Sequence, residues 1–316
     1  MLAPRELDIY EKNCYSVRLK KLSPKTLVFT LHSDTFRHLY DMSSIYTLNV
    51  RVQNTSMDDM KRFVEKCLLS SEFHHAVTIN PDLIMVAQKD AAFLQTLNNA
   101  DFSTVDGIGA YLPFLLKGEI PKGRVSGSDF IDFLLSRSEH HKKPVFLLVN
   151  DSGLSSFTEI KNAIHNVFPT LEISGIAVSP HSQTSLQDAL EEASKYPVVI
   201  SNFGGRYQEI SLAKLRRMTG NASRIAVGIG GAFDFLTGKQ KRAPFLVRKF
   251  GFEWLWRLLL QPQRRLKRTW NYVVIYSLLC FKEAFFEWIL FGKNWTRSLV
   301  LKTSKKTPLL PGKHNS

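Results

Sequence analysis

The strongest constraint on the fold is an alternation of apolar runs and helical segments that begins near residue 46 and continues to residue 229. The run Pro144–Val149 (PVFLLV) is continuously hydrophobic, as expected of a strand buried on both faces of a parallel sheet. After Thr55-Ser56, which can cap a helix, apolar residues recur at helical spacing as far as Leu69. This alternation predicts a doubly wound, mainly parallel α/β domain of the Rossmann-like kind.

The pattern divides the chain into three parts. Residues 1–44 form an N-terminal extension of unknown role with one candidate strand at 26–31, residues 45–238 form the α/β body, and residues 239–316 form a helical C-terminal appendage. Within the body the expected strands are 46–52, 75–79, 102–105, 144–149, 171–176, 198–201 and 224–229. The expected helices are 55–69, 81–98, one from 107 onward, 128–136, 154–167, 182–195 and 208–218.

The excess positive charge lies entirely in the appendage. The chain carries a net charge of +14, and residues 237–316 hold 17 of its 42 Lys and Arg but only 3 of its 28 Asp and Glu. The same segment contains all 5 tryptophans. Cations combined with amphipathic aromatic side chains are typical of an anionic membrane surface. We therefore expect the appendage to associate with a membrane.

The region from residue 270 to 291 is apolar, but Lys282, Glu283 and Glu287 interrupt it. Its longest uncharged run is shorter than the ~20 residues that a membrane span needs. We expect it to lie in or on the membrane interface; the alternative is a helix packed on the protein body or on a partner subunit. The beginning of the sequence shows no export signal and the cysteines are few and scattered, so we expect a reducing compartment.

In doubly wound sheets ligands bind at the carboxyl ends of the strands, and here these positions are polar or rich in glycine. Asp106 follows an apolar run and precedes Gly107 and Gly109, which let the backbone approach a ligand. Asp106 is therefore a candidate general base, with a helix N-cap as the alternative. The glycines Gly230 and Gly231 could cradle a pyrophosphate but lack the dinucleotide-binding spacing.

Other polar residues have ordinary interpretations when they are considered one at a time. Thr78 and Asn80 end a strand, where turn and cap residues are common, and Gln208-Glu209 is typical of a solvated first helical turn. The pairs His74-His75 and His140-His141 have no acidic or cysteine partner at ligand spacing, which argues against a metal site.

Taken together, six blocks of sequence resemble the WecG/TagA/CpsF bacterial glycosyltransferases, also called glycosyltransferase family 26. They occur in family order over roughly residues 46–270, which is far more specific than any one block. The blocks are Thr78-Ile79-Asn80-Pro81-Asp82, Val105-Asp106-Gly107-Ile108-Gly109, Arg124-Val125-Ser126-Gly127-Ser128-Asp129, Gln208-Glu209, Gly228-Ile229-Gly230-Gly231-Ala232-Phe233-Asp234-Phe235, and Arg242-Ala243-Pro244 with 251–258.

The resemblance implies an inverting transfer of an N-acetylmannosaminyl or related hexosyl group from a UDP-sugar to a sugar on a polyprenyl diphosphate, in bacterial cell-surface polysaccharide synthesis. It implies that Asp106 is the base and that Thr78, Asn80, Arg124 and Gln208 line the active site. The expected nucleotide-sugar contacts are Gly107, Gly109, Glu209, Gly230, Gly231 and Asp234.

The family has no known metal requirement, so no metal and no cofactor are expected. The expected location is the cytoplasmic face of the bacterial inner membrane, as a peripheral protein, and the resemblance leaves the oligomeric state open. An inverting transfer also needs cations that stabilise the departing diphosphate. Arg257, Arg264 and Arg268 would share about one face of a helix, although Pro262 interrupts that helix. We expect them to contact the lipid diphosphate or the leaving group; the alternative is a basic face resting on lipid phosphates.

Three rival functions follow from the same sequence. An inactive family relative could serve as a membrane-bound assembly factor. A nucleic-acid-binding protein would use the basic tail on phosphates, but apolar aromatic clusters such as Phe285-Phe286 argue against it. A dinucleotide-dependent oxidoreductase would require the glycine fingerprint that the sequence lacks.

Overall fold

The computed structural model describes residues 43–218, 220–244, 246–247, 251–260 and 262–289, together with four short strands before residue 34. The chain divides into two compact units, Met1–Ser43 and Ser44–Ser316. In the first unit β1 (Tyr15–Val17) pairs antiparallel with β4 (Leu31–Ser33), and β2 (Lys20–Ser23) pairs antiparallel with β3 (Thr26–Val28). The expected division at residue 238 between body and appendage stays a prediction.

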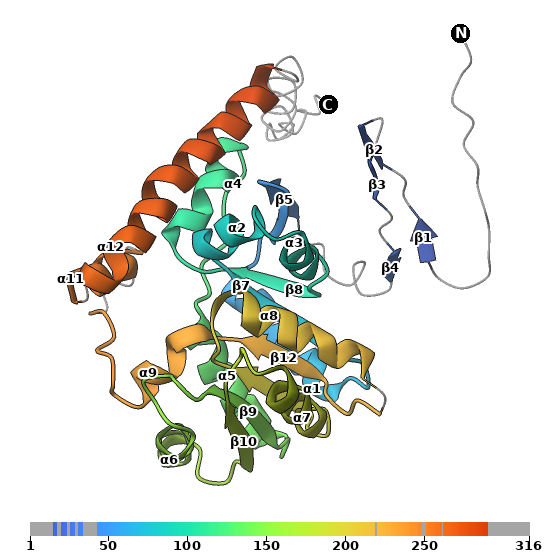
Figure 1. The fold of residues 1–316 in the computed structure, drawn as a ribbon, viewed down its shortest axis with the longest axis vertical. Coiled ribbons are helices and arrows are strands. Elements are labelled where there is room, and N and C mark those ends of the chain that lie inside the picture. The colour runs from blue at the N-terminus through green and yellow to red at the C-terminus, as the bar shows by residue number, and fades with distance from the viewer. Residues whose placement is uncertain are drawn as a thin grey trace, which may run out of the picture. The chain divides into compact units, whose positions relative to one another are not determined.

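The second unit is built on a six-stranded parallel sheet, which confirms the predicted fold class (Figure 1). Its strand order is β10-β9-β11-β12-β7-β8. The bounds are β7 His74–Ile79, β8 Phe102–Val105, β9 Val145–Asn150, β10 Ile173–Val178, β11 Val198–Ser201 and β12 Ile225–Gly228. β7, β8, β11 and β12 are buried throughout, because helices cover both faces.

Adjacent residues of β7 show the two faces of the sheet, because successive side chains of a strand point in opposite directions. The ring of His74 packs edge-on against Phe63 of α1 (Met57–Leu69), while His75 contacts Glu209 of α8 (Gly205–Lys214). With α1 lie α5 (Gly127–His140) and α6 (Phe157–Val167). With α8 lie α2 (Pro81–Ala87), α3 (Ala91–Asn98) and α7 (Gln183–Ala193).

Three predicted elements are wrong in detail. The candidate strand 26–31 is two strands, because β3 pairs with β2 and β4 pairs with β1. The expected strand 46–52 is an antiparallel hairpin of β5 (Ser44–Thr47) and β6 (Val50–Gln53), because Leu48 and Asn49 both adopt positive φ and reverse the chain. The expected helix 81–98 is two helices, α2 and α3. Asp90 caps α3 by accepting a hydrogen bond from the amide of Phe93, so a new helix begins there.

The remaining elements are short. They are η1 (Ile108–Tyr111), α4 (Leu112–Leu116), η2 (Leu215–Arg217), η3 (Gly230–Ala232) and α9 (Phe233–Leu236). Along the chain, η1 and α4 follow β8, η2 follows α8, and η3 and α9 follow β12.

The C-terminal part of the unit is helical and follows α11 (Glu253–Leu260). α12 (Pro262–Trp270) continues through the π-helical turn η4 (Asn271–Ile275) into a helix that the structure describes to residue 289; these three segments are called the C-terminal helix below (Figure 1). Among the described residues no helix is long and apolar enough to cross a membrane.

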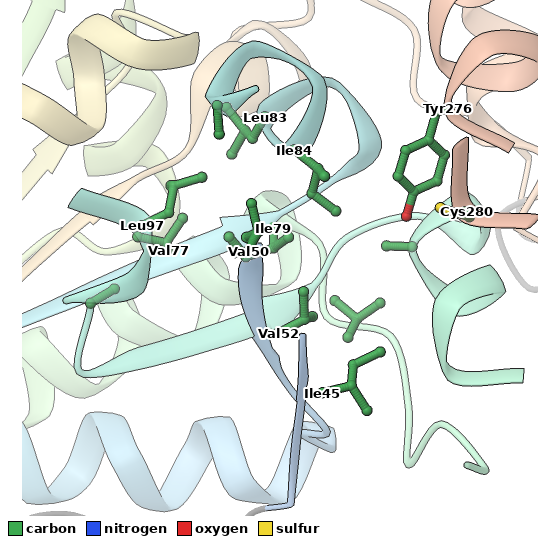
Figure 2. Close-up of a cluster of buried hydrophobic side chains, with 14 of the residues drawn as sticks. Ile45, Val50, Val52, Val77, Ile79, Leu83, Ile84, Leu97, Tyr276 and Cys280 are labelled. Carbon is green, nitrogen blue, oxygen red and sulfur yellow. The ribbon is translucent and has the colours of Figure 1, made fainter. Parts of the chain in front are cut away.

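One side of the C-terminal helix belongs to the core of the body. Tyr276 and Cys280 join a buried cluster with residues of the β5–β6 hairpin, β7 and α2, among them Ile84 (Figure 2). Glu283 accepts hydrogen bonds from the Thr47 hydroxyl (3.1 Å) and the Leu48 amide (2.8 Å). The packing alternative is therefore observed for this side of the helix.

Candidate active site

The sequence blocks that carry the resemblance meet at the carboxyl edge of the sheet. The amide of Val125 donates to the carbonyl of Val105 (3.0 Å), so the segment before α5 runs beside the end of β8. Gly109 lies so close to Pro81 that a Cβ on it would come within 2.9 Å of the proline ring. Segments separated by tens of residues in the sequence thus form one continuous surface.

Further contacts bring the blocks after β12 to the same surface. A Cβ on Gly127 would come within 3.2 Å of the carbonyl oxygen of Ile229. Arg242 pairs with Asp129 (2.8 Å) and Asp132 (3.7 Å), which ties the segment after α9 to the first turns of α5. Burial raises the pKa of Asp132, an effect that the Arg242 guanidinium opposes.

The start of the C-terminal region reaches this surface as well. Gly251 has φ +76°, and a Cβ on it would come within 2.8 Å of the Cβ of Ile108, next to Gly107. Glu253, at the start of α11, is buried and lies 3.9 Å from the guanidinium of Arg124. The part of the basic appendage around Gly251 is therefore packed directly on the turn that follows Asp106.

Asp106 is placed at the end of β8, and its amide donates to the carbonyl of Ile79 (2.7 Å). The N-cap position of the following helix η1 is Gly107, which has φ +88° and no side chain of its own to cap the helix. The alternative of an N-cap aspartate is therefore wrong in its geometry. The two candidates at the end of β7 differ in their surroundings. Thr78 is buried opposite Thr104 of β8, whereas Asn80 caps α2 by accepting a hydrogen bond from the amide of Leu83 (3.0 Å).

The interpretation of Gln208-Glu209 as a solvated first turn is wrong. Both side chains are buried, with exposed fractions of 4% and 0%. Glu209 lies 3.0 Å from the Nε2 atom of His75, a partner that is 134 residues away in the sequence. Sequence spacing around His74-His75 gives no indication of this pair, because its members are distant in the chain.

The glycine turn after β12 carries the remaining nucleotide candidates. The amide of Gly230 donates to the Gln208 side chain (3.0 Å), so that hydrogen already has a protein acceptor. Gly231 lies beside Asp234, with 3.2 Å between an added Cβ and the carboxylate oxygen Oδ2. Asp234 is itself buried and accepts a hydrogen bond from the Ser155 hydroxyl (2.8 Å).

The three arginine candidates lie on the helices beyond this surface. Arg257 is in α11, and Arg264 and Arg268 are in α12, but their side chains lie outside the described part of the structure. Among the described residues no group of three His, Cys, Asp or Glu side chains is arranged to hold a metal ion.

Comparison with known proteins shows the family of the chain. The sequence model of a family described as "Glycosyl transferase WecG/TagA/CpsF family" matches residues 45–288. A protein of Bacillus spizizenii named N-acetylglucosaminyldiphosphoundecaprenol N-acetyl-beta-D-mannosaminyltransferase is 32% identical over 193 residues, which cover 60% of this chain and 72% of the relative. A protein of Bacillus subtilis with the same name is 25% identical over 217 residues, which cover 68% of this chain and 83% of the relative.

Proposed function

Because the chain belongs to the WecG/TagA/CpsF family of glycosyltransferases, we propose that it transfers a hexosyl group from a UDP-sugar to a sugar linked to polyprenyl diphosphate. The names of both relatives describe an N-acetylmannosaminyl group and a diphosphoundecaprenol-linked acceptor. They support N-acetylmannosamine or a related sugar as the transferred group and a polyprenyl-diphosphate-linked sugar as the acceptor. The observation that carries the proposal is the convergence of the six blocks, from Thr78 to the segment at Glu253, at the carboxyl edge of one parallel sheet.

The proposed chemistry is an inverting displacement with Asp106 as the general base. Its carboxylate would take the proton of the acceptor hydroxyl as that oxygen attacks the sugar carbon, and the bond from this carbon to the UDP oxygen would break. Gly107 has positive φ with open space where a Cβ would stand, so the backbone leaves room for a substrate next to Asp106.

Cations near the leaving group would stabilise the departing diphosphate. Arg124 lies at the edge of the sheet next to α11 and is a candidate for this task. We assign the same task to Arg257, Arg264 and Arg268, whose helices α11 and α12 follow the segment packed on the Asp106 turn. Their combined replacement by alanine should reduce transfer even to a soluble acceptor that needs no membrane.

The outer side of the C-terminal helix supports a peripheral membrane location. Trp270, Leu278, Phe281, Phe285 and Trp288 are each more than half exposed, although they lie on the same helix as the buried Tyr276. Exposed apolar side chains in a row are typical of protein or membrane contact surfaces. A lipid-linked acceptor would place the reaction at such a surface, and we propose the cytoplasmic face of the inner membrane.

The direct test incubates the protein with a synthetic lipid-linked N-acetylglucosamine acceptor and a panel of UDP-sugars, and follows both UDP release and the mass of the lipid product. We expect UDP-N-acetylmannosamine or a related hexosamine donor to give a product one hexosyl residue heavier. An inactive assembly factor would bind the membrane but release no UDP with any donor, and that outcome would contradict the proposal.

A further inference from the structure

Two turns at the carboxyl edge of the sheet share one hydrogen-bond acceptor. The Oε1 atom of Gln208 accepts from the amide of Gly204, which follows β11, and from the amide of Gly230, which follows β12. The two distances are 3.2 Å and 3.0 Å. Gly204 has φ +78° and Gly230 has φ +52°, so both turns adopt backbone that glycine tolerates best. A single carboxamide therefore connects the exits of two neighbouring strands.

The orientation of the Gln208 carboxamide is set by its hydrogen bond to the buried carboxylate of Glu209. Gln208 Nε2 donates to Glu209 Oε1 (2.7 Å), and Glu209 Oε2 lies 3.0 Å from His75 Nε2 on β7. A carboxylate only accepts hydrogen bonds, so the amide end of Gln208 faces Glu209 and its oxygen faces the two glycine amides. The order of donors and acceptors is thus fixed from β7 to the two turns.

Burial and space make this arrangement specific. His75, Gln208 and Glu209 have exposed fractions of 2%, 4% and 0%. A Cβ on Gly228, the last residue of β12, would come within 1.9 Å of Gln208 Nε2 and 2.4 Å of Glu209 Oε1. Only glycine leaves room at this position for the two side chains to cross the strand.

We propose that His75, Glu209 and Gln208 form a brace that fixes the separation of the Gly204 and Gly230 turns and so shapes the binding site of the donor nucleotide. This inference rests on the proposed UDP-sugar donor. It makes the three side chains positioning residues, because the oxygen and nitrogen atoms of the Gln208 carboxamide and both Glu209 oxygens have protein partners. The resemblance placed Gln208 among the residues lining the active site; the brace gives it an indirect task.

The experiment compares three variants of the full chain. Glu209→Ala removes the centre of the brace. Glu209→Gln preserves it, since the new carboxamide oxygen accepts from Gln208 and its amino group donates to His75 in the other ring tautomer. The control is Glu65→Ala, which removes a similar carboxylate–histidine contact (2.9 Å to His141). That contact lies at the C-terminal end of α5, ~20 Å from the end of α5 that touches the site.

Two measurements test the brace and the proposed nucleotide binding independently of each other. The first is hydrogen exchange of the Gly204 and Gly230 amides by nuclear magnetic resonance, which needs no ligand. Glu209→Ala should speed exchange of both amides about tenfold or more, while Glu209→Gln and Glu65→Ala should stay near the parent. The second is calorimetry with UDP. Glu209→Ala should weaken UDP binding about tenfold, and Glu209→Gln should recover most of that affinity.

Each outcome decides one statement. Unchanged exchange in Glu209→Ala would overturn the brace. Faster exchange with unchanged UDP affinity would overturn its role in nucleotide binding. Loss of UDP binding in Glu209→Gln that equals the loss in Glu209→Ala would mean that the carboxylate itself is needed, which contradicts a purely positioning role. If the parent protein fails to bind UDP, the proposed donor is wrong. The brace is then tested by the amide exchange rates alone, which need no ligand.

Discussion

The carboxyl edge of the sheet and the C-terminal helix use buried and exposed groups in opposite ways. At the edge, charged side chains such as Glu209 and Asp234 are buried and hydrogen-bonded to side chains of other segments. On the helix, large apolar side chains such as Phe285 and Trp288 are exposed, whereas Tyr276 is buried in the body. A hydrogen-bonded polar edge is suited to positioning reactants, and an exposed apolar surface is suited to contact with a lipid membrane.

The largest effect should come from the edge. Asp106→Asn retains the size of the side chain but removes the oxygen that would accept a proton, so we expect transfer to fall by ~10²–10⁴-fold. Binding of UDP and of lipid vesicles should change little. The rate is measured as UDP release at saturating donor and acceptor. A variant that transfers sugar at the parent rate would place the base elsewhere.

The buried side of the C-terminal helix should matter for stability. Tyr276 is fully buried in the cluster with Ile84 and the hairpin, so Tyr276→Ala should lower the free energy of unfolding by ~3–5 kcal/mol. Leu278→Ala, two residues away on the same helix but 64% exposed, is the matched control and should change it by less than ~0.5 kcal/mol. Denaturant unfolding followed by circular dichroism provides both values. Equal effects of the two substitutions would show that the helix is not docked as described.

The burial of Tyr276 and Cys280 also predicts the effect of removing the C-terminal helix. A chain ending before residue 270 would lose Tyr276, Cys280 and Glu283, and would leave the apolar cluster and the Thr47–Leu48 turn without these partners. The appendage is therefore no detachable anchor, and vesicle binding is better tested by substitutions on its exposed side.

The exposed side of the helix should matter for membrane affinity. Replacing Phe285 and Trp288 together by serine removes two exposed aromatic side chains, each of which contributes ~1.5–3 kcal/mol when it is buried in an apolar phase. Binding to anionic vesicles should weaken about 10²-fold or more, with unfolding unchanged. Sedimentation with vesicles measures the binding. Undiminished binding would leave the basic residues as the whole of the membrane attraction.

The smallest effect concerns whether the helix stays on the body when it meets a membrane. Burial raises the pKa of the Cys280 thiol, so its reaction with a maleimide should be slow at neutral pH. If the helix remains docked, vesicles should leave the modification rate of the Cys280 peptide unchanged, as judged by mass spectrometry. Acceleration by vesicles would mean that the helix leaves the body to enter the lipid.

The sequence predicted the strands and the edge better than it predicted contacts across the fold. Strands β8 and β11 have the predicted bounds. For β11 the reason is clear, because its buried apolar run Val198-Val199-Ile200 ends at the polar residues Ser201 and Asn202. The hairpin at Leu48-Asn49 was missed because its reversal depends on two positive φ angles in residues other than glycine. The pair of His75 and Glu209 was missed because only the folded sheet brings together residues so far apart in the chain.

The most direct test of the division between edge and helix is the rate of transfer to two acceptors, one soluble and short-chained, the other carried in anionic vesicles. The Phe285→Ser, Trp288→Ser double variant should transfer to the soluble acceptor at the parent rate and to the vesicle acceptor at least tenfold more slowly at low protein concentration. Asp106→Asn should be slow with both acceptors. Equal slowing of the double variant on both acceptors would contradict the account, because it would make the exposed face of the helix part of the chemistry at the sheet edge.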